Sequence, residues 1–393
     1  MGDTEPNLQN YNWCEDDSGQ ETEEYPIDYE IMASPNDFNI LTIFNFIESG
    51  TVKIPGFQRN YVWDIKRASK LIESLIIGLP VPQVFLYEAG KNNFLVIDGQ
   101  QRLMSIYYFI KQRFPKLEKR AELRKIFEKH GKIPDDMLHN DEHFAKFNLR
   151  LPEPSPDKPN RFNGMNYSTL GEYKSTFDLR PIRNVIIKQL LPKDNDSAIY
   201  EIFNRLNSGG INLSPQEIRM SISHSDFFDM LSRINTNEEW RKLLGLPDPD
   251  LHMKDIEILL RGFSMLIKGN EYAPSMMQFL NGFAKDVQKY DKQTNSYFES
   301  LFISFINSCS DLDKELFFGS SNRFSVMVFE SIFTIACKKS YSKQQLISGN
   351  IDKESIQKLK KDEAFISFIT GKTTNTKYVR GRLSRAEDIV RVV

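Results

Sequence analysis

The chain has 393 residues, 40% of them hydrophobic and 26% charged, which is typical of a globular protein with more than one core. Its three cysteines, Cys14, Cys309 and Cys337, are too few and too far apart for a disulfide-rich fold or a zinc site with the usual cysteine spacing. Neither a signal peptide nor an apolar run of membrane-spanning length is evident, which predicts a cytoplasmic protein without a membrane partner.

The net charge of −2 hides an uneven distribution. Residues 1–52 contain 12 acidic and no basic side chains, so residues 53–393 hold 41 acidic and 51 basic ones, a net charge of +10. The first part, residues 1–30, is acidic and poor in apolar side chains, which predicts a mobile tail. A net charge of +10 is compatible with a nucleic-acid partner but does not require one.

For residues 31–222, the sequence predicts both helices and strands. Helices are predicted, from apolar periodicity and end signals, over 35–50, 65–77, 100–113, 196–210 and 213–223, and 115–150 is also expected to be mainly helical. Strands are predicted in a hairpin over 83–98 and again over 180–192. Residues 223–393 show mainly helical periodicity. The sequence thus predicts an α+β fold, with an N-terminal mixed domain (31–222) and an α-helical domain (223–393).

The stretch FLVIDGQQRLMSIYYF changes from a β-prone run to helical periodicity after Asp98. A strand that enters a helix through Asp-Gly places backbone N–H groups at the turn, where the helix dipole also attracts anions. Arg102 can offer phosphate a planar fork of donors, and Asp98 can hold Mg²⁺ or orient a water molecule. Gln100 and Gln101 suit a base, a ribose or a water molecule.

A purely structural interpretation has Asp98 capping the helix and Gly99 relieving the turn. For Asp98 alone we favour that interpretation. For the whole pentapeptide we favour function, because stability does not require two amides and an arginine together there.

A second candidate segment is IPGFQRNYVW. Phe57, Tyr61 and Trp63 alternate along an extended chain and so share a face. Aromatic side chains beside Gln58 and Arg59 suit stacking and hydrogen bonding to a base. The alternative places the aromatic side chains in the core and Arg59 on the surface. We expect Trp63 in the core, and Gln58 and Arg59 in the site.

A third candidate segment is IFNRLNSGGINLSPQEIRM. Its glycine-rich loop would let a phosphate or ribose approach the backbone closely. The candidate binding residues here are Arg205, Asn207, Ser208, Gly209 and Gly210. Ser214 and Glu217 have the spacing of a capping box, so their expected role is structural. Arg219 fits either role.

His139 and His143 lie four residues apart, as metal ligands on one helix face do. They occur in a charged segment without a third ligand nearby in sequence. A solvated helix face is the expected explanation.

In chain order, the three segments resemble the domain family at the N-terminus of GmrSD-type modification-dependent restriction endonucleases, over roughly residues 35–222. The resemblance implies a small mixed sheet flanked by helices, distantly related to the ParB and sulfiredoxin fold, with a nucleotide-phosphate site at the DGQQR turn. It also implies nucleoside-triphosphate hydrolysis in several members and a role in bacterial defence against phage or modified DNA. The residues that match the hydrolysis motif are Asp98, Gly99, Gln100, Gln101 and Arg102. Those that match the segment for sensing nucleotide or modified DNA are Phe57, Gln58 and Arg59.

The sequence departs from these endonucleases in its C-terminal half, where we find no His-Asn-His nuclease motif after residue 223. Cleavage of DNA by this chain alone is therefore not expected. We expect the helical half to regulate, to form a homo-oligomer or to recruit a separate effector protein.

Three functional hypotheses follow. The first is an enzyme that hydrolyses an NTP with Mg²⁺, in which Arg102 and Arg59 clamp phosphates, Asp98 binds metal or orients water, and turnover gates DNA recognition or an effector. The second is a sensor or regulatory partner that binds nucleotide or DNA without turnover. The third is a nuclease with a ParB-like site. We rank them in this order because the DGQQR turn resembles a phosphate cradle and a nuclease would usually show more metal-ligating side chains.

Overall fold

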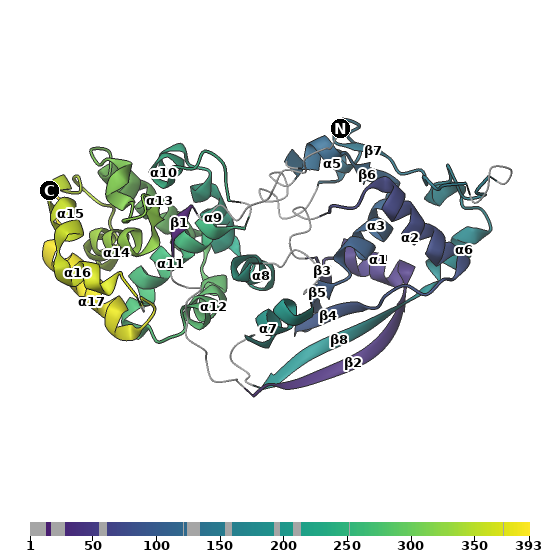
Figure 1. The fold of residues 1–393 in the computed structure, drawn as a ribbon, viewed down its shortest axis with the longest axis horizontal. Coiled ribbons are helices and arrows are strands. Elements are labelled where there is room, and N and C mark those ends of the chain that lie inside the picture. The colour runs from purple at the N-terminus through teal and green to yellow at the C-terminus, as the bar shows by residue number, and fades with distance from the viewer. Residues whose placement is uncertain are drawn as a thin grey trace. The chain divides into compact units, whose positions relative to one another are not determined.

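The computed structural model describes residues 13–16, 28–54, 61–120, 122–123, 134–153, 159–191, 197–206, 214–250, 252–371 and 373–393. They form two compact units (Figure 1). The sheet unit is Asp28–Ile222, and the helical unit combines Ser223–Val393 with the described residues 13–16. The predicted α+β class is confirmed, since the main sheet lies in the first unit and helices dominate the second.

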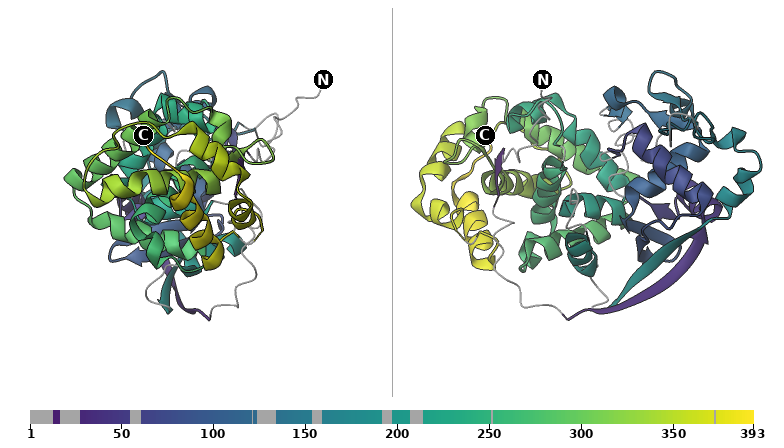
Figure 2. Two further views of the ribbon diagram at one scale, coloured as in Figure 1. Left: turned by 90° about the vertical axis from the view of Figure 1, so that its left-hand side faces the viewer. Right: turned by 45° about the vertical axis from the view of Figure 1, so that its right-hand side comes forward.

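The sheet unit is built on a five-stranded mixed sheet in the order β2-β8-β4-β5-β3. Pairing is antiparallel between β2 and β8 and between β4 and β5, and parallel between β8 and β4 and between β5 and β3. The long strands β2 (purple) and β8 (teal) run side by side (Figure 2). The strands of this sheet are β2 (Glu30–Asn39), β3 (Val52–Lys53), β4 (Val84–Gly90), β5 (Asn93–Asp98) and β8 (Pro181–Leu191).

Helices and a small hairpin complete the sheet unit. Helix α3 packs against both α1 and α2, and the three are drawn together beside the sheet in Figure 1. The α-helices are α1 (Ile40–Glu48), α2 (Ile65–Ile77), α3 (Gln100–Ile110), α5 (Asp135–Leu138), α6 (Tyr173–Asp178), α7 (Ser197–Leu206) and α8 (Pro215–Ile222). The 3₁₀-helices are η2 (Leu117–Lys119) and η3 (Tyr167–Thr169), and the hairpin pairs β6 (Arg113–Pro115) with β7 (Phe144–Lys146).

Local signals set the ends of α2 as predicted. The Asp64 carboxylate accepts a hydrogen bond from the Arg67 N–H at 2.7 Å and caps the first turn. Gly78 ends the helix in the left-handed conformation with φ of 87°. Between these caps, Ile72 and Leu75 are fully buried and carry the apolar face.

Two predictions of helix are wrong in part. Residues 35–39 belong to β2, because their backbone pairs with β8, and α1 begins only after Asn39, whose side chain accepts from the Thr42 N–H. In 115–150, the described residues comprise the end of β6, η2, helical residues at 120 and 122–123, the short α5 and β7, together with turns. Phe144 and Phe147 are fully buried there, so the charged side chains surround a small core instead of lining a helix.

The helical unit has an aromatic core. Phe263 is fully buried and packs edge to face against Phe298 at a centroid separation of 5.6 Å and against Phe333 at 5.3 Å. The α-helices are α9 (Asp226–Asn235), α10 (Glu238–Leu244), α11 (Lys254–Lys268), α12 (Met276–Asp286), α13 (Lys292–Ser308), α14 (Val326–Ser342), α15 (Lys353–Lys361), α16 (Glu363–Phe368) and α17 (Thr376–Ile389). The remaining elements are β1 (Cys14–Glu15), β9 (Phe324–Ser325) and the 3₁₀-helices η4 (Gly269–Glu271), η5 (Val287–Lys289) and η6 (Lys314–Phe317).

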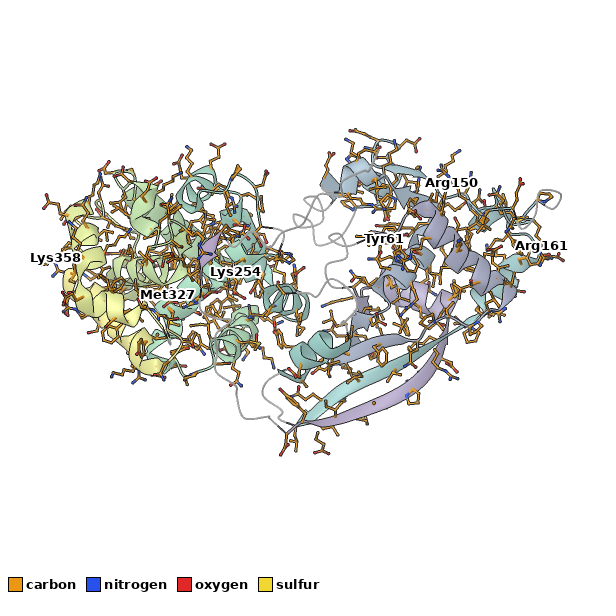
Figure 3. All side chains as sticks on the ribbon, viewed as in Figure 1. Tyr61, Arg150, Arg161, Lys254, Met327 and Lys358 are labelled. Atoms are coloured by element: carbon orange, nitrogen blue, oxygen red, sulfur yellow. The ribbon has the colours of Figure 1, made fainter. Side chains whose placement is uncertain are left out.

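Residues 13–16 pack into the helical unit. Strand β1 pairs in parallel with β9, and the Asp16 carboxylate binds Lys254 (labelled in Figure 3) and Arg261, the latter at 2.9 Å. The Asp16 side chain is only 7% exposed. This part of the predicted acidic tail is therefore held by backbone pairing and ion pairs, in contrast to the expected mobility.

A buried charge cluster links three helices of this unit. Glu330 on α14 is fully buried, pairs with Arg261 on α11, and accepts hydrogen bonds from Arg382 on α17 at 2.6 and 3.0 Å. Burial alone would raise the pKa of Glu330, but the two guanidinium groups hold it below its usual value. The ionised carboxylate is therefore part of the folded core.

We predict that Glu330→Ala lowers the free energy of unfolding by about 3–5 kcal/mol, because it leaves the buried Arg382 without its carboxylate and removes one of the two carboxylates that pair with the buried Arg261. The measurement is urea unfolding at neutral pH. The control is Glu239→Ala, which removes an exposed pair with Lys242 and should lower the stability far less. Equal effects of the two substitutions would contradict this role for Glu330.

A comparison of wild type and Glu330→Ala at different pH values tests whether the carboxylate of Glu330 is ionised in the folded protein. Since the pKa of Glu330 is lowered on folding, its contribution is present above its unfolded value of about 4.5 and is lost as the pH falls through the lower folded value. The difference in stability between wild type and Glu330→Ala should therefore shrink below about pH 4.

Candidate functional site

The candidate site of the sheet unit is centred on the turn between β5 and α3. Strand β5 ends at Asp98, α3 begins at Gln100, and Gly99 between them has φ of 96° and ψ of 8°. A Cβ atom on Gly99 would lie 2.8 Å from Cγ2 of the buried Val84 and 3.1 Å from Nη2 of Arg102. Both the positive φ and the lack of space require glycine here.

Asp98 and Arg102 face each other across this turn. Nη2 of Arg102 donates to Oδ2 of Asp98 at 3.0 Å and to the carbonyl oxygen of Gln83 at 3.0 Å. The Arg102 side chain is 17% exposed and that of Asp98 is 42% exposed. The Arg102 Nε–H is buried and has no hydrogen-bond partner in the described part of the chain. The Nη2 group of Arg102 is thus held by two acceptors, while its Nε–H group has no acceptor among the described residues.

Gln101 joins the turn to the second candidate segment. Its Oε1 accepts hydrogen bonds from the backbone N–H groups of Val62 at 3.0 Å and Trp63 at 3.3 Å. One turn further along α3, the Ser105 hydroxyl donates to the Gln101 carbonyl at 2.8 Å and lies 3.0 Å from the Tyr61 hydroxyl. The two segments are therefore neighbours in space. The other predicted residues of the second segment, Phe57, Gln58 and Arg59, lie outside the described residues.

Tyr61 lies in the core of the sheet unit (labelled in Figure 3). It is 4% exposed and packs edge to face on Tyr108 and Phe114. Burial raises the pKa of its hydroxyl well above the usual range. Trp63 is only partly buried, with the guanidinium of Arg67 4.7 Å from its ring centroid. Trp63 packs against the core from this partly buried position, so the core position expected for it is confirmed only in part. Tyr61 lies deeper, and its ring is not accessible for stacking on a base in this conformation.

The third candidate segment begins on α7, which packs on β5. Arg205 is in the last turn of α7, and its side chain lies outside the described part of the structure. So do the loop residues Asn207, Ser208, Gly209 and Gly210.

The start of α8 has the predicted capping box. The Ser214 N–H donates to the Glu217 carboxylate at 2.7 Å, and the Glu217 N–H donates to the Ser214 hydroxyl at 3.2 Å. Arg219, for which the sequence left two roles open, is 2% exposed and donates to the Gln216 side chain. These contacts give Arg219 a structural role within the sheet unit.

The two histidines do not share a helix face. His139 follows α5, and its Nδ1 lies 2.7 Å from the Asp135 carbonyl oxygen. His143 precedes β7 and is 4% exposed, so the expected solvated position is wrong for His143.

Residues 40–223 match the family described as the GmrSD restriction endonuclease, N-terminal domain. This segment is a GmrSD N-terminal domain. The resemblance drawn from the three segments is thereby confirmed. The domain covers all the described elements of the candidate site, from the segment after β3 to α8.

One curated relative is the uncharacterized protein MJ0686 of Methanocaldococcus jannaschii, which is 21% identical over 368 residues. The match covers 67% of this chain and 63% of the relative, so the chain spans less than two thirds of that protein. No solved structure matches. In the part of the chain that the structure describes, no helix is long and apolar enough to cross a membrane.

We predict that Gln101→Ala increases amide hydrogen exchange at Val62 and Trp63 about fivefold, because each lost hydrogen bond contributes about 1 kcal/mol. The measurement is hydrogen–deuterium exchange of peptides that cover residues 62 and 63. Gln101→Glu retains an acceptor oxygen and should keep the slow exchange of the wild type. If exchange is unchanged in Gln101→Ala, Gln101 does not hold this segment.

Proposed function

We propose that the GmrSD N-terminal domain binds a nucleoside triphosphate at the turn 98–102 and hydrolyses it with Mg²⁺. In this proposal the protein serves in bacterial defence, and turnover controls DNA recognition or a separate effector. The observation that carries the proposal is the state of Arg102. Its guanidinium is anchored on Asp98 and on the Gln83 carbonyl, yet its buried Nε–H has no partner among the described residues. Phosphate oxygens are strong acceptors for such a donor.

The start of α3 adds a second attraction for phosphate. This helix has 11 residues, and the N–H groups of its first turn lie at the positive end of the helix dipole. The geometry of the turn thus supports a phosphate group next to Gly99 and Arg102.

Asp98 suits a role beside a metal-bound phosphate. Its carboxylate is 42% exposed, and Oδ2 is the oxygen that Arg102 contacts, which leaves Oδ1 for a further interaction. Mg²⁺ in phosphate sites usually takes one or two carboxylates together with phosphate oxygens and waters, so a single exposed aspartate fits. The ion would supply charge neutralisation. Asp98 would hold it or orient the attacking water molecule.

The remaining residues divide between chemistry and support. In this proposal Gln100, the first residue of α3, orients water or ribose, and Gln101 acts as a positioning residue for residues 61–63. Arg59 would reach a second phosphate, and the loop 207–210 would approach the ribose. Both predictions concern residues beyond the described ones.

DNA is the proposed macromolecular partner. The family that matches residues 40–223 is named after the GmrSD restriction endonuclease, and restriction endonucleases act on DNA. The excess of ten basic side chains after residue 52 is compatible with that partner.

We predict that wild type with Mg²⁺ releases phosphate from at least one of ATP, GTP, CTP and UTP, and that Arg102→Ala slows release by about 10²–10³-fold through lost charge stabilisation. The assay is run with and without duplex DNA. Arg183→Ala is the matched control, since it removes an exposed arginine on β8 whose partner is Asp37, and its rate should equal that of wild type. Equal rates in Arg102→Ala and wild type would contradict the assigned role.

Binding without turnover is the second candidate function. It is favoured by the contact of 3.0 Å between Asp98 and Arg102, because a carboxylate that already neutralises an arginine is less available to a metal ion. Saturable nucleotide binding without phosphate release under any condition would select this function. Metal-dependent nicking of plasmid DNA would instead select the nuclease.

A further inference from the structure

A second cluster of ligand-type side chains lies elsewhere in the sheet unit. Glu122 follows η2, and Glu142 and His143 lie in the turn before β7. The potential ligand atoms of these three residues are all within 4.8 Å of one another. None of them belongs to the turn at Asp98 or to the other two candidate segments.

His143 is the unusual member of this cluster. Its side chain is 5% exposed, and neither ring nitrogen has a hydrogen-bond partner in the described part of the chain. Nε2 lies 3.0 Å from Oε1 of Glu122, so the ring is aimed at the carboxylate without the alignment of a hydrogen bond. A buried imidazole in this state is costly unless something else satisfies it.

The two glutamates already hold a cation. The ammonium of Lys119 lies 2.5 Å from Oε1 of Glu142 and 3.0 Å from Oε2 of Glu122. Both carboxylates are therefore directed at one cation.

We propose that Glu122, Glu142 and His143 form a site for one divalent first-row transition metal ion, which displaces the Lys119 ammonium when it binds. The imidazole favours zinc and its neighbours over Mg²⁺ and Ca²⁺, which prefer oxygen ligands only. A bound ion would replace the poorly aligned contact between Nε2 of His143 and Oε1 of Glu122 with a direct metal–nitrogen bond. It would also fasten the segment after η2 to the β6–β7 hairpin.

The geometry needs only a small adjustment. Zinc binds nitrogen and carboxylate oxygen at about 2.0–2.2 Å in a tetrahedral arrangement, so its ligand atoms lie roughly 3.5 Å apart. The Glu122 and Glu142 side chains are 49% and 61% exposed, which leaves them free to close in on a fixed His143. Three protein ligands leave the fourth position to a water molecule.

The test is zinc binding by the full chain, measured after removal of bound metal and in competition with a chromophoric chelator. Wild type should bind one zinc ion at this site. His143→Gln should weaken binding by more than about tenfold, since the loss of a direct ligand exceeds the usual effect of an outer-sphere change. Glu142→Gln should weaken it similarly, and this exposed substitution preserves the fold if that of buried His143 does not.

Two further variants separate a metal site from an ion-pair cluster. Lys119→Met removes the competing ammonium and should strengthen zinc binding severalfold. His139→Gln, four residues from His143, should leave the affinity unchanged, because His139 is not one of the proposed ligands and its Nδ1 lies 2.7 Å from the Asp135 carbonyl oxygen. The proposal is overturned if neither wild type nor Lys119→Met binds zinc, or if Glu142→Gln binds it as tightly as wild type.

Discussion

A Cβ atom has no room at position 99, and the candidate site depends on that constraint. Because Gly99 adopts a positive φ against the side chain of Val84, β5 can turn directly into α3. Strand β5 is fixed by its pairing with β3 and β4, and α3 is fixed by buried side chains such as Met104 and Phe109. The positions of the strand end and the helix start are therefore set by the core. Asp98 at the strand end and Arg102 in the first turn of the helix are placed accordingly.

The DGQQR motif divides into residues that shape the turn and two charged residues that pair with each other. Gly99 permits the turn, and Gln101 holds the backbone of residues 62 and 63. Asp98 and Arg102 form a partly exposed pair with one buried donor unsatisfied. The pentapeptide is thus not five catalytic groups in a row. Its structural members bring two candidate segments together, and its charged members form the ion pair on which the proposed phosphate site rests.

The features that could be predicted from sequence are those encoded locally. Helix α2 was predicted with its bounds because Asp64 and Gly78 act within one turn, and the Ser214 capping box spans four residues. The β4–β5 hairpin and the turn at Gly99 also depend on near neighbours.

The features that were missed depend on partners distant in sequence. Residues 35–39 form a strand because β8, about 150 residues later, pairs with them. Residues 13–16 are ordered by Lys254 and Arg261, which no local pattern could reveal. The same holds for individual side-chain contacts. Neither the hydrogen bond from the Val62 N–H to Gln101 nor, elsewhere in the sheet unit, the approach of His143 to Glu122 has a signature in sequence spacing.

The most direct test of the phosphate site is photo-crosslinking of the full chain with an NTP analogue that carries the reactive group on its γ-phosphate. We expect a crosslink in the peptide that contains residues 98–102 or in the neighbouring residues 61–63, prevented by excess unlabelled NTP. A competable crosslink that maps only outside residues 28–222 would contradict a phosphate site at the turn 98–102.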